Sequence, residues 1–320
     1  MIQAYDEFGL FGENIAEFDL PNAGTPVVRR IEVPVVTPDE GTAEGTRIVS
    51  ALVWGESEPQ LVFVHGGAQN AHTWDTVALA LGVPMIAVDL PGHGHSGWRD
   101  DGAYTPPNLA DDVATVVREH APNAKAVVGM SLGGLTSLEL AHRHPELVRQ
   151  LVLVDITPGV NQQKAKAVID FVDGPQTFPS FDDLLARTME HNPTRSESSL
   201  RRGILHNAHQ TADGHWQWNY DRRSHARSRE ADAATADTTT DPTADAAAVA
   251  HAPLWDHLGE LTCPITLVRG ALSPVVDDDD VAEARRRQPG IRVEVIDGAG
   301  HSIQGDRPVE LAALIREIVL

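Results

Sequence analysis

The residue pattern best suited to chemistry is Gly129-Met130-Ser131-Leu132-Gly133. An apolar run at 126–128 predicts a short buried strand before it, and the helical spacing after it predicts a helix that ends before Pro145. A serine on a tight strand-to-helix turn is forced outward, because the flanking positions have room only for glycine. Its hydroxyl would stand beside backbone N–H groups without intrahelical partners. Such a pattern also occurs by chance in loops, but the strand and helix around it favour a nucleophilic serine.

A serine hydroxyl is unreactive at neutral pH unless a base removes its proton. His301 is the predicted base, because its Gly-rich loop directly follows the predicted strand 291–296, at the sheet edge where ligands bind. Among the other histidines, His65 is expected to brace its own loop, and His206 and His209 are expected on the surface. No spacing among the 15 histidines and the single cysteine indicates a zinc site, so we expect neither a metal nor a cofactor.

The elements that must position these side chains alternate along the chain. Short apolar runs predict strands, and the segments between them have the spacing of amphipathic helices. This alternation predicts an α/β fold with a mostly parallel central sheet, flanked on both faces by helices. The predicted strands are 27–36, 47–54, 61–64, 84–88, 126–128, 151–154, 265–268 and 291–296. Pro34 limits the first strand to a sheet edge, and residues 1–26 are expected to form an ordered but irregular arm.

The order of four motifs resembles the α/β-hydrolase superfamily. The motifs are His65-Gly66-Gly67, the segment Asp89-Leu90-Pro91-Gly92-His93-Gly94-His95-Ser96, the serine pentapeptide, and Gly298-Ala299-Gly300-His301. The resemblance covers nearly the whole chain apart from an inserted segment and the first residues, and it implies the α/β-hydrolase fold.

The resemblance also implies a reaction. It points to a serine hydrolase that cleaves a carboxylic ester or lactone of a small, largely apolar substrate through an acyl-enzyme. Serine at position 131 excludes the usual form of the branches that use an aspartate nucleophile. Hydrolysis of C–C bonds, thioesters or amides stays open, as does non-catalytic ligand binding on the same fold.

The acid that would orient His301 has two candidates. In much of the superfamily the acid follows the strand that here is 265–268, but Ser273 stands at that place. The resemblance to an esterase- and lactonase-like branch implies Asp155, which follows the strand 151–154. Asp277 is the alternative acid, although it has a ready explanation as the cap of the helix that follows it.

The remaining parts of the site are an oxyanion hole and a pocket. The resemblance implies that the backbone N–H groups of Leu132 and Gly67 form the oxyanion hole, with Met130 adjacent. Several apolar side chains could line the pocket, but their apolar character is explained equally well by packing in the core or the cap. The candidates are Trp74, Met130, Trp216 and Trp218.

Residues 159–255 interrupt the strand–helix alternation and are predicted to form an inserted helical cap between core segments 1–158 and 256–320. Helical spacing occurs near 163–171, 181–190 and 196–207. The segment 228–250 consists almost wholly of Ala, Asp and Thr, and it is predicted to be a mobile loop because it offers little apolar surface to bury.

Composition limits the partners. The net charge of −21 argues against nucleic acid and anionic membrane surfaces as partners. No apolar run approaches the ~18 residues of a membrane span, and the first twenty residues lack the pattern of a signal peptide. The single cysteine, Cys263, cannot form an intrachain disulfide, which agrees with a cytoplasmic location. We expect a small-molecule substrate, and the sequence leaves the oligomeric state open.

Overall fold

The computed structural model describes residues 5–21, 26–37, 45–222 and 246–320. Most of the predicted mobile loop, 228–245, lies outside these residues. The last five residues of that loop, 246–250, instead begin a helix, α9 (Ala246–Glu260). No described helix combines the length and apolar character needed to cross a membrane.

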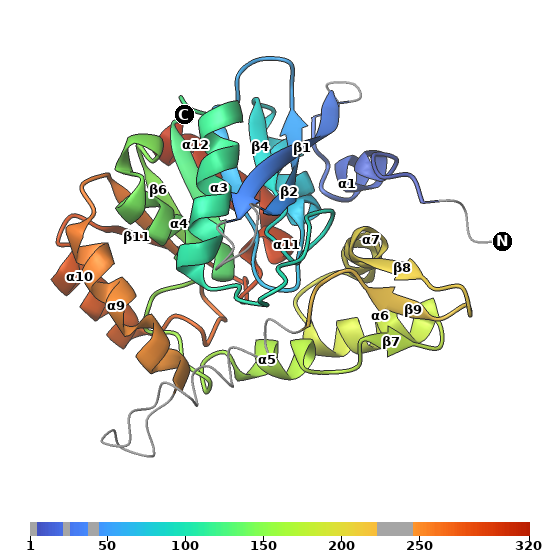
Figure 1. Cartoon of the computed structure of the whole chain (residues 1–320). Coiled ribbons are helices and arrows are strands. Elements are labelled where there is room, and N and C mark those ends of the chain that lie inside the picture. The colour runs from blue at the N-terminus through green and yellow to red at the C-terminus, as the bar shows by residue number, and fades with distance from the viewer. Residues whose placement is uncertain (1–4, 22–25, 38–44, 223–245) are drawn as a thin grey trace.

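The central sheet has eight strands in the order β1-β2-β4-β3-β5-β6-β10-β11 (Figure 1). The prediction of a mostly parallel sheet is confirmed: only the pairings of β1 with β2 and β2 with β4 are antiparallel. The first strand, which contains Pro34, lies at the edge as predicted. The strands are β1 (Val28–Thr37), β2 (Gly45–Trp54), β3 (Leu61–Val64), β4 (Met85–Val88), β5 (Ala126–Met130), β6 (Leu151–Val154), β10 (Ile265–Gly270) and β11 (Arg292–Ile296).

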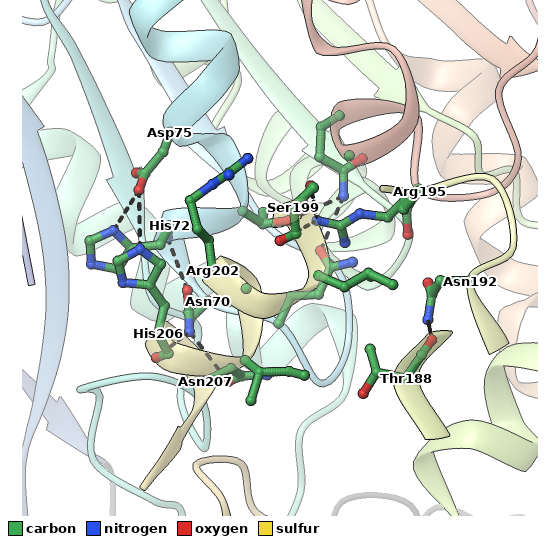
Figure 2. Close-up of a pocket in the computed structure, with 18 of the residues that line it drawn as sticks. Asn70, His72, Asp75, Thr188, Asn192, Arg195, Ser199, Arg202, His206 and Asn207 are labelled. Carbon is green, nitrogen blue, oxygen red and sulfur yellow. Dashed lines mark hydrogen bonds and ion pairs between the residues drawn. The ribbon is translucent and has the colours of Figure 1, made fainter. Parts of the chain in front are cut away.

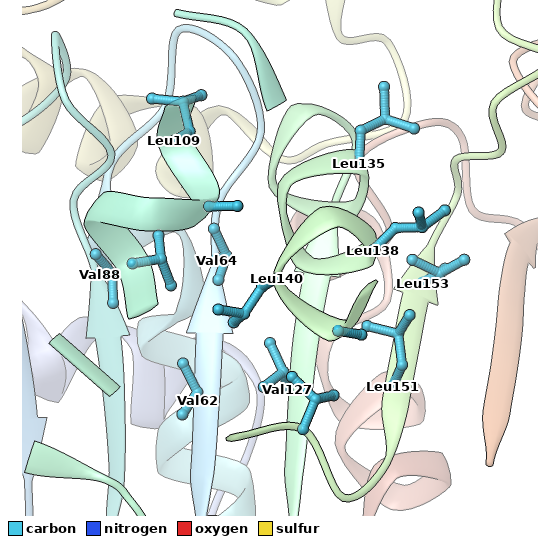
Figure 3. Packing of buried hydrophobic residues seen from close by; sticks show 14 of the residues in the cluster. Val62, Val64, Val88, Leu109, Val127, Leu135, Leu138, Leu140, Leu151 and Leu153 are labelled. Carbon is cyan, nitrogen blue, oxygen red and sulfur yellow. The ribbon is translucent and has the colours of Figure 1, made fainter. Parts of the chain in front are cut away.

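Helices cover both faces of the sheet, because successive residues of each buried strand point to opposite faces. Val62 and Val64 of β3 belong to one apolar cluster, and Leu61 and Phe63 belong to the other. Figure 3 shows the first cluster, in which leucines of α4 pack onto β3, β5 and β6. The helices contributing to this cluster are α3 (Pro106–His120), α4 (Leu132–Arg143), α9 and α10 (Asp278–Arg287). Those contributing to the second cluster are α1 (Phe11–Glu17), α2 (Asp75–Leu81), α11 (Ile303–Asp306) and α12 (Pro308–Val319), together with the 3₁₀ turn η1 (Ala71–Trp74). The 3₁₀ turn η2 (Pro145–Leu147) contributes Leu147 to the first cluster.

The segment after β6 forms a separate layer beside the sheet, seen at the lower right of Figure 1. Its three predicted helices are present, and they surround a small antiparallel sheet that the sequence did not predict. The strands of this sheet are only two or three residues long, which is too short for an alternating pattern to show. The elements are α5 (Lys166–Val172), β7 (Thr177–Phe178), α6 (Phe181–His191), α7 (Glu197–Asn207), β8 (Ala208–Gln210) and β9 (Trp216–Trp218).

The far boundary of the cap differs from the prediction of residue 255. Leu254 and Leu258 of α9 are buried in the same apolar cluster as α4. Their i, i+4 spacing places both on one face of the helix, so the chain rejoins the core with α9.

The N-terminal segment also differs from the irregular arm that was expected. It contains α1, and Phe11 of this helix packs against Trp54 with ring centroids 4.9 Å apart. The polar face of α1 contacts α7 of the cap: Arg202 Nε donates to Asn14 Oδ1 at 2.9 Å, and Arg202 also pairs with Glu17. This short helix therefore links the core to the cap.

The packing of α9 gives a first prediction. Leu258→Ala should lower the free energy of unfolding by about 2–5 kcal/mol, because it leaves a cavity in a closed apolar cluster. Denaturant titration followed by circular dichroism measures the change. The matched control is Leu272→Ala, at a leucine that is 62% exposed, and it should change the free energy by less than about 0.5 kcal/mol. Equal losses in the two variants would contradict the assignment of α9 to the core.

Candidate active site

Ser131 lies on the turn between β5 and α4 with φ 50° and ψ −121°, in a region that residues with a side chain rarely adopt. The backbone around it is tightly packed. A Cβ on Gly133 would collide with the carbonyl oxygens of Val64 and His65, and a Cβ on Gly129 would collide with the carbonyl oxygen of Gly133. The two glycines of the pentapeptide are therefore required by close backbone approach.

The structure brings Ser131, His301 and Asp155 together. His301 Nε2 lies 3.1 Å from Ser131 Oγ, and His301 Nδ1 lies 2.8 Å from Asp155 Oδ2. The tautomer with its proton on Nδ1 donates to the carboxylate and leaves Nε2 free to accept from the serine hydroxyl. This arrangement can remove the hydroxyl proton.

Asp155 is held from several sides. It follows β6, is fully buried, and has a positive φ of 51°. The N–H of Gly270 donates to its Oδ1 at 2.9 Å, and the hydroxyl of Ser273 donates to its Oδ2. Ser273 stands at the position where the superfamily often has the acid. Here its hydroxyl hydrogen-bonds to an acid that follows a different strand, β6.

Asp277, the alternative acid, lies elsewhere. It is the N-cap of α10, where its Oδ1 accepts from the Asp280 N–H at 2.9 Å. Its other carboxylate oxygen lies 2.9 Å from Lys164 Nζ. These are the contacts of a helix cap, and Asp277 makes none with His301 in the described structure.

The loop after β3 leaves the amide N–H of Gly67 without an acceptor among the described residues. The N–H of Gly66 donates to Gln69 Oε1 at 3.2 Å, and that of Ala68 donates to His93 Nε2 at 3.0 Å. Between them, the N–H of Gly67 donates to no residue that the structure describes, and the same holds for the N–H of Leu132 in the first turn of α4. Both amides flank the serine turn, as an oxyanion hole requires.

His65 braces this loop as predicted. Its Nδ1 donates to the Gly66 carbonyl at 2.7 Å, and its Nε2 accepts from the Leu90 N–H at 2.9 Å. Burial lowers the pKa of His65, which favours this neutral form.

A pocket of about 130 Å³ opens between the cap and the core. Its core side includes Gln69, two residues after Gly67, and Ser302, the residue after His301. Its cap side includes Phe171, Trp218 and polar side chains of α6, α7 and the connection between them, such as Arg195 (Figure 2). Asn70, His72 and Asp75, also labelled in Figure 2, line the core side. The apolar wall expected from the sequence is therefore only one part of a largely polar pocket.

Of the four predicted pocket residues, Trp218 alone lines this pocket in the described structure. Trp74 is fully buried in the core against Phe63, and Met130 is 1% exposed in the same cluster, which corrects both predictions. Trp216 packs edge-on against Phe181 inside the cap, so it too is a packing residue. Large apolar side chains near a turn cannot be assigned to a pocket from local pattern alone.

His72, Asp75 and His206 are the described residues that bring possible metal ligands within 4.8 Å of one another (Figure 2). The two imidazole rings, however, are stacked 3.8 Å apart at an angle of 8°. No point lies in both ring planes, where the nitrogen lone pairs point, so a shared metal does not fit this geometry. His206 is also buried, although the sequence placed it on the surface.

These residues instead form a hydrogen-bonded cluster between cap and core. His72 Nδ1 lies 2.9 Å from Asp75 Oδ2, and His72 Nε2 lies 3.1 Å from Glu7 Oε1. Burial opposes the charge, but the two carboxylates outweigh it and raise the pKa of His72 to about 9. Burial, followed by the charge of His72, holds the pKa of His206 well below its usual range. His206 Nδ1 therefore accepts from the Tyr5 hydroxyl at 2.7 Å.

Comparison with known proteins places the chain in a family. A sequence model of the alpha/beta hydrolase fold matches residues 59–308, so the chain belongs to the α/β-hydrolase family. Esterase Rv0045c of Mycobacterium tuberculosis is 41% identical over 321 residues, covering 98% of this chain and 96% of that protein. A solved structure of that esterase superposes with a TM-score of 0.80 and covers 99% of each chain. The 2-(acetamidomethylene)succinate hydrolase of Mesorhizobium japonicum is 28% identical over 79% of this chain and 84% of its own length.

The charged His72 gives a prediction for stability against pH. Its pKa of about 9 in the folded protein exceeds its ordinary value of 6.5, so its stabilisation is complete below about pH 6.5 and is lost as the pH rises through about 9. Loss of the His72 charge should lower the free energy of unfolding by up to about 3 kcal/mol over that pH range. The His72→Gln variant should not show this decrease. Denaturant titrations near both ends of the range test it.

The control for this experiment is His209→Gln, which removes an exposed imidazole from the cap. This variant should keep the pH dependence of the wild type. A constant difference between wild type and His72→Gln across the whole range would contradict the charged state assigned to His72.

Proposed function

We propose that this protein hydrolyses small carboxylic esters or lactones, with Ser131 as nucleophile, His301 as general base and Asp155 as the orienting acid. The observation that carries the proposal is the continuous contact from the serine hydroxyl through the imidazole to a buried carboxylate. The 41% identity to a protein named as an esterase over nearly the whole chain supports the same reaction.

The geometry accounts for each step. Ser131 Oγ attacks the ester carbonyl while its proton passes to His301 Nε2, and the imidazolium that forms is stabilised by Asp155. The amides of Gly67 and Leu132 would donate to the oxyanion. The tetrahedral intermediate collapses as His301 returns the proton to the leaving alcohol, which leaves an acyl group on Ser131. Water, deprotonated by the same histidine, then releases the acid and restores the serine.

The setting of this reaction is also part of the proposal. The net charge of −21 favours small molecules over nucleic acid or anionic membranes as partners. A single cysteine agrees with a reducing cytoplasm.

Ser131→Ala should abolish hydrolysis of p-nitrophenyl acetate, with a loss on the order of 10⁶ in kcat for a triad serine. Release of p-nitrophenol measures it. Ser198→Ala, at an exposed serine of α7, is the control and should retain the wild-type rate. Equal rates in wild type and Ser131→Ala would end the hydrolase proposal. A fluorophosphonate adduct on a residue other than Ser131 would overturn the assignment of the nucleophile.

Replacing each candidate acid by asparagine distinguishes which of the two orients His301. Asp155→Asn should lower kcat by about 10⁴, because the amide no longer holds the productive imidazole tautomer. Asp277→Asn should keep a rate within about twofold of wild type and nearly full stability, since asparagine is an equally good N-cap. The same ester assay and a thermal melt measure both. A slow Asp277→Asn beside an active Asp155→Asn would reverse the assignment.

A further inference from the structure

Arg195 is a cation of the pocket that forms no ion pair with the residues the structure describes. Its side chain comes from the connection between α6 and α7, and its Nη2 donates to Ser199 Oγ at 2.9 Å. Its Nε is buried and has no hydrogen-bond partner. Among the residues that the structure describes, no carboxylate oxygen lies within 4.0 Å of the Arg195 guanidinium. Arg195 as a whole is half-buried, and a charge partly withdrawn from water without an ion-pair partner is costly, so this position needs an explanation.

Arg202, which also lines the pocket, shows how the protein treats a purely structural arginine. It is 4% exposed, and its guanidinium contacts Glu17 and Asn14 of α1. Its charge is therefore compensated inside the protein. Arg195 makes no such ion pair with a described carboxylate. Burial lowers the pKa of its guanidinium, and the charge of Asp306, more than 4.0 Å away, only partly opposes this effect.

The position of Arg195 is fixed relative to His301. Its guanidinium packs closely against Gly305 of α11, where a Cβ would stand only 2.8 Å from Arg195 Cζ. The preceding Thr194 donates to Asp306 Oδ1 at 2.9 Å, and the other oxygen of Asp306 accepts from the Gly300 N–H at 2.7 Å. Both carboxylate oxygens of Asp306 therefore accept hydrogen bonds, one of them from the loop that carries His301. Arg195 faces the pocket beside that loop.

The rest of the pocket suits a small acid with an apolar spacer. Phe171 and Trp218 supply apolar surface for the spacer. We propose that Arg195 binds a carboxylate carried by the ester itself, so that the preferred substrates are half-esters of small dicarboxylic acids. The planar guanidinium matches a carboxylate in geometry and compensates its charge. This inference rests on the proposed ester hydrolysis, and it replaces the largely apolar substrate expected from the sequence with an anionic one.

The test compares two esters of equal size. Monomethyl glutarate carries a carboxylate, and methyl 4-carbamoylbutanoate carries a neutral amide at the same position; the succinate and adipate pairs vary the spacer. Wild type should show a kcat/KM about 10- to 100-fold higher for the anionic ester of the best-fitting pair, the range typical of a hydrogen bond to a charged group. Arg195→Gln should reduce this ratio by about tenfold or more, chiefly through the KM of the anion.

Arg201→Gln is the matched control. Arg201 lies on α7, is half-buried, pairs with Glu13 and does not line the pocket, so its removal changes the net charge equally without touching the pocket. This variant should keep the wild-type ratio. A wild type that does not prefer any of the anionic esters, or a ratio that survives in Arg195→Gln, would overturn the inference. An equal fall for both esters would do the same, because it would show that Arg195 only holds the cap.

A measurement on the wild type alone covers the case in which Arg195→Gln does not fold. Glutarate should inhibit p-nitrophenyl acetate hydrolysis competitively, at a concentration about tenfold or more below that of glutaramide. Equal inhibition by the two would count against the carboxylate site. The proposed function is judged separately: if hydrolysis of p-nitrophenyl acetate depends on Ser131 but no anion preference exists, only this inference fails.

Discussion

The backbone at Ser131 is held in a left-handed conformation that only close packing around it can maintain. The carbonyls of β3 and the first turn of α4 approach so closely that Gly129 and Gly133 tolerate no side chain. Asp155 and Ala68 also have positive φ values, so three loops that meet around the serine are strained. Each such residue costs about 1–3 kcal/mol, which the rigid sheet between two apolar clusters can sustain. The active site therefore depends on the packed sheet, which holds these strained turns in place.

The cap is attached to this rigid sheet mainly through polar contacts. α1 contributes Asn14 and Glu17 to Arg202, and the stacked pair of His72 and His206 joins the core to α7. The cap also has an apolar cluster of its own, which holds its helices and small sheet together. Because the cap has its own apolar core and contacts the sheet domain through polar groups, a pocket can form between the cap and the core. That pocket lies beside the histidine loop because Thr194 and Arg195 dock there.

Much of the fold was predictable because its signals are local. Apolar runs of four or five residues, separated by amphipathic helices, defined the parallel sheet, and Pro34 assigned the first strand to an edge. The two- and three-residue strands of the cap gave no such signal. α1 was missed for a related reason: it has seven residues, and its partners Arg201 and Arg202 lie nearly two hundred residues away.

By itself the sequence determined which side chains follow strands at the carboxyl edge of the sheet, among them Ser131, Asp155 and His301. It also supplied the glycines without which the serine turn could not form. Only the tertiary structure showed that Asp155 contacts the imidazole and that Asp277 caps α10 away from it, because the sequence left both as candidates. It alone showed that Trp74 and Met130 lie in the core, and that Arg195 lines the pocket without an ion pair to any described carboxylate. The physical reason is that strand and helix periodicity is set by near neighbours, whereas burial and charge pairing depend on segments that folding brings together from distant parts of the chain.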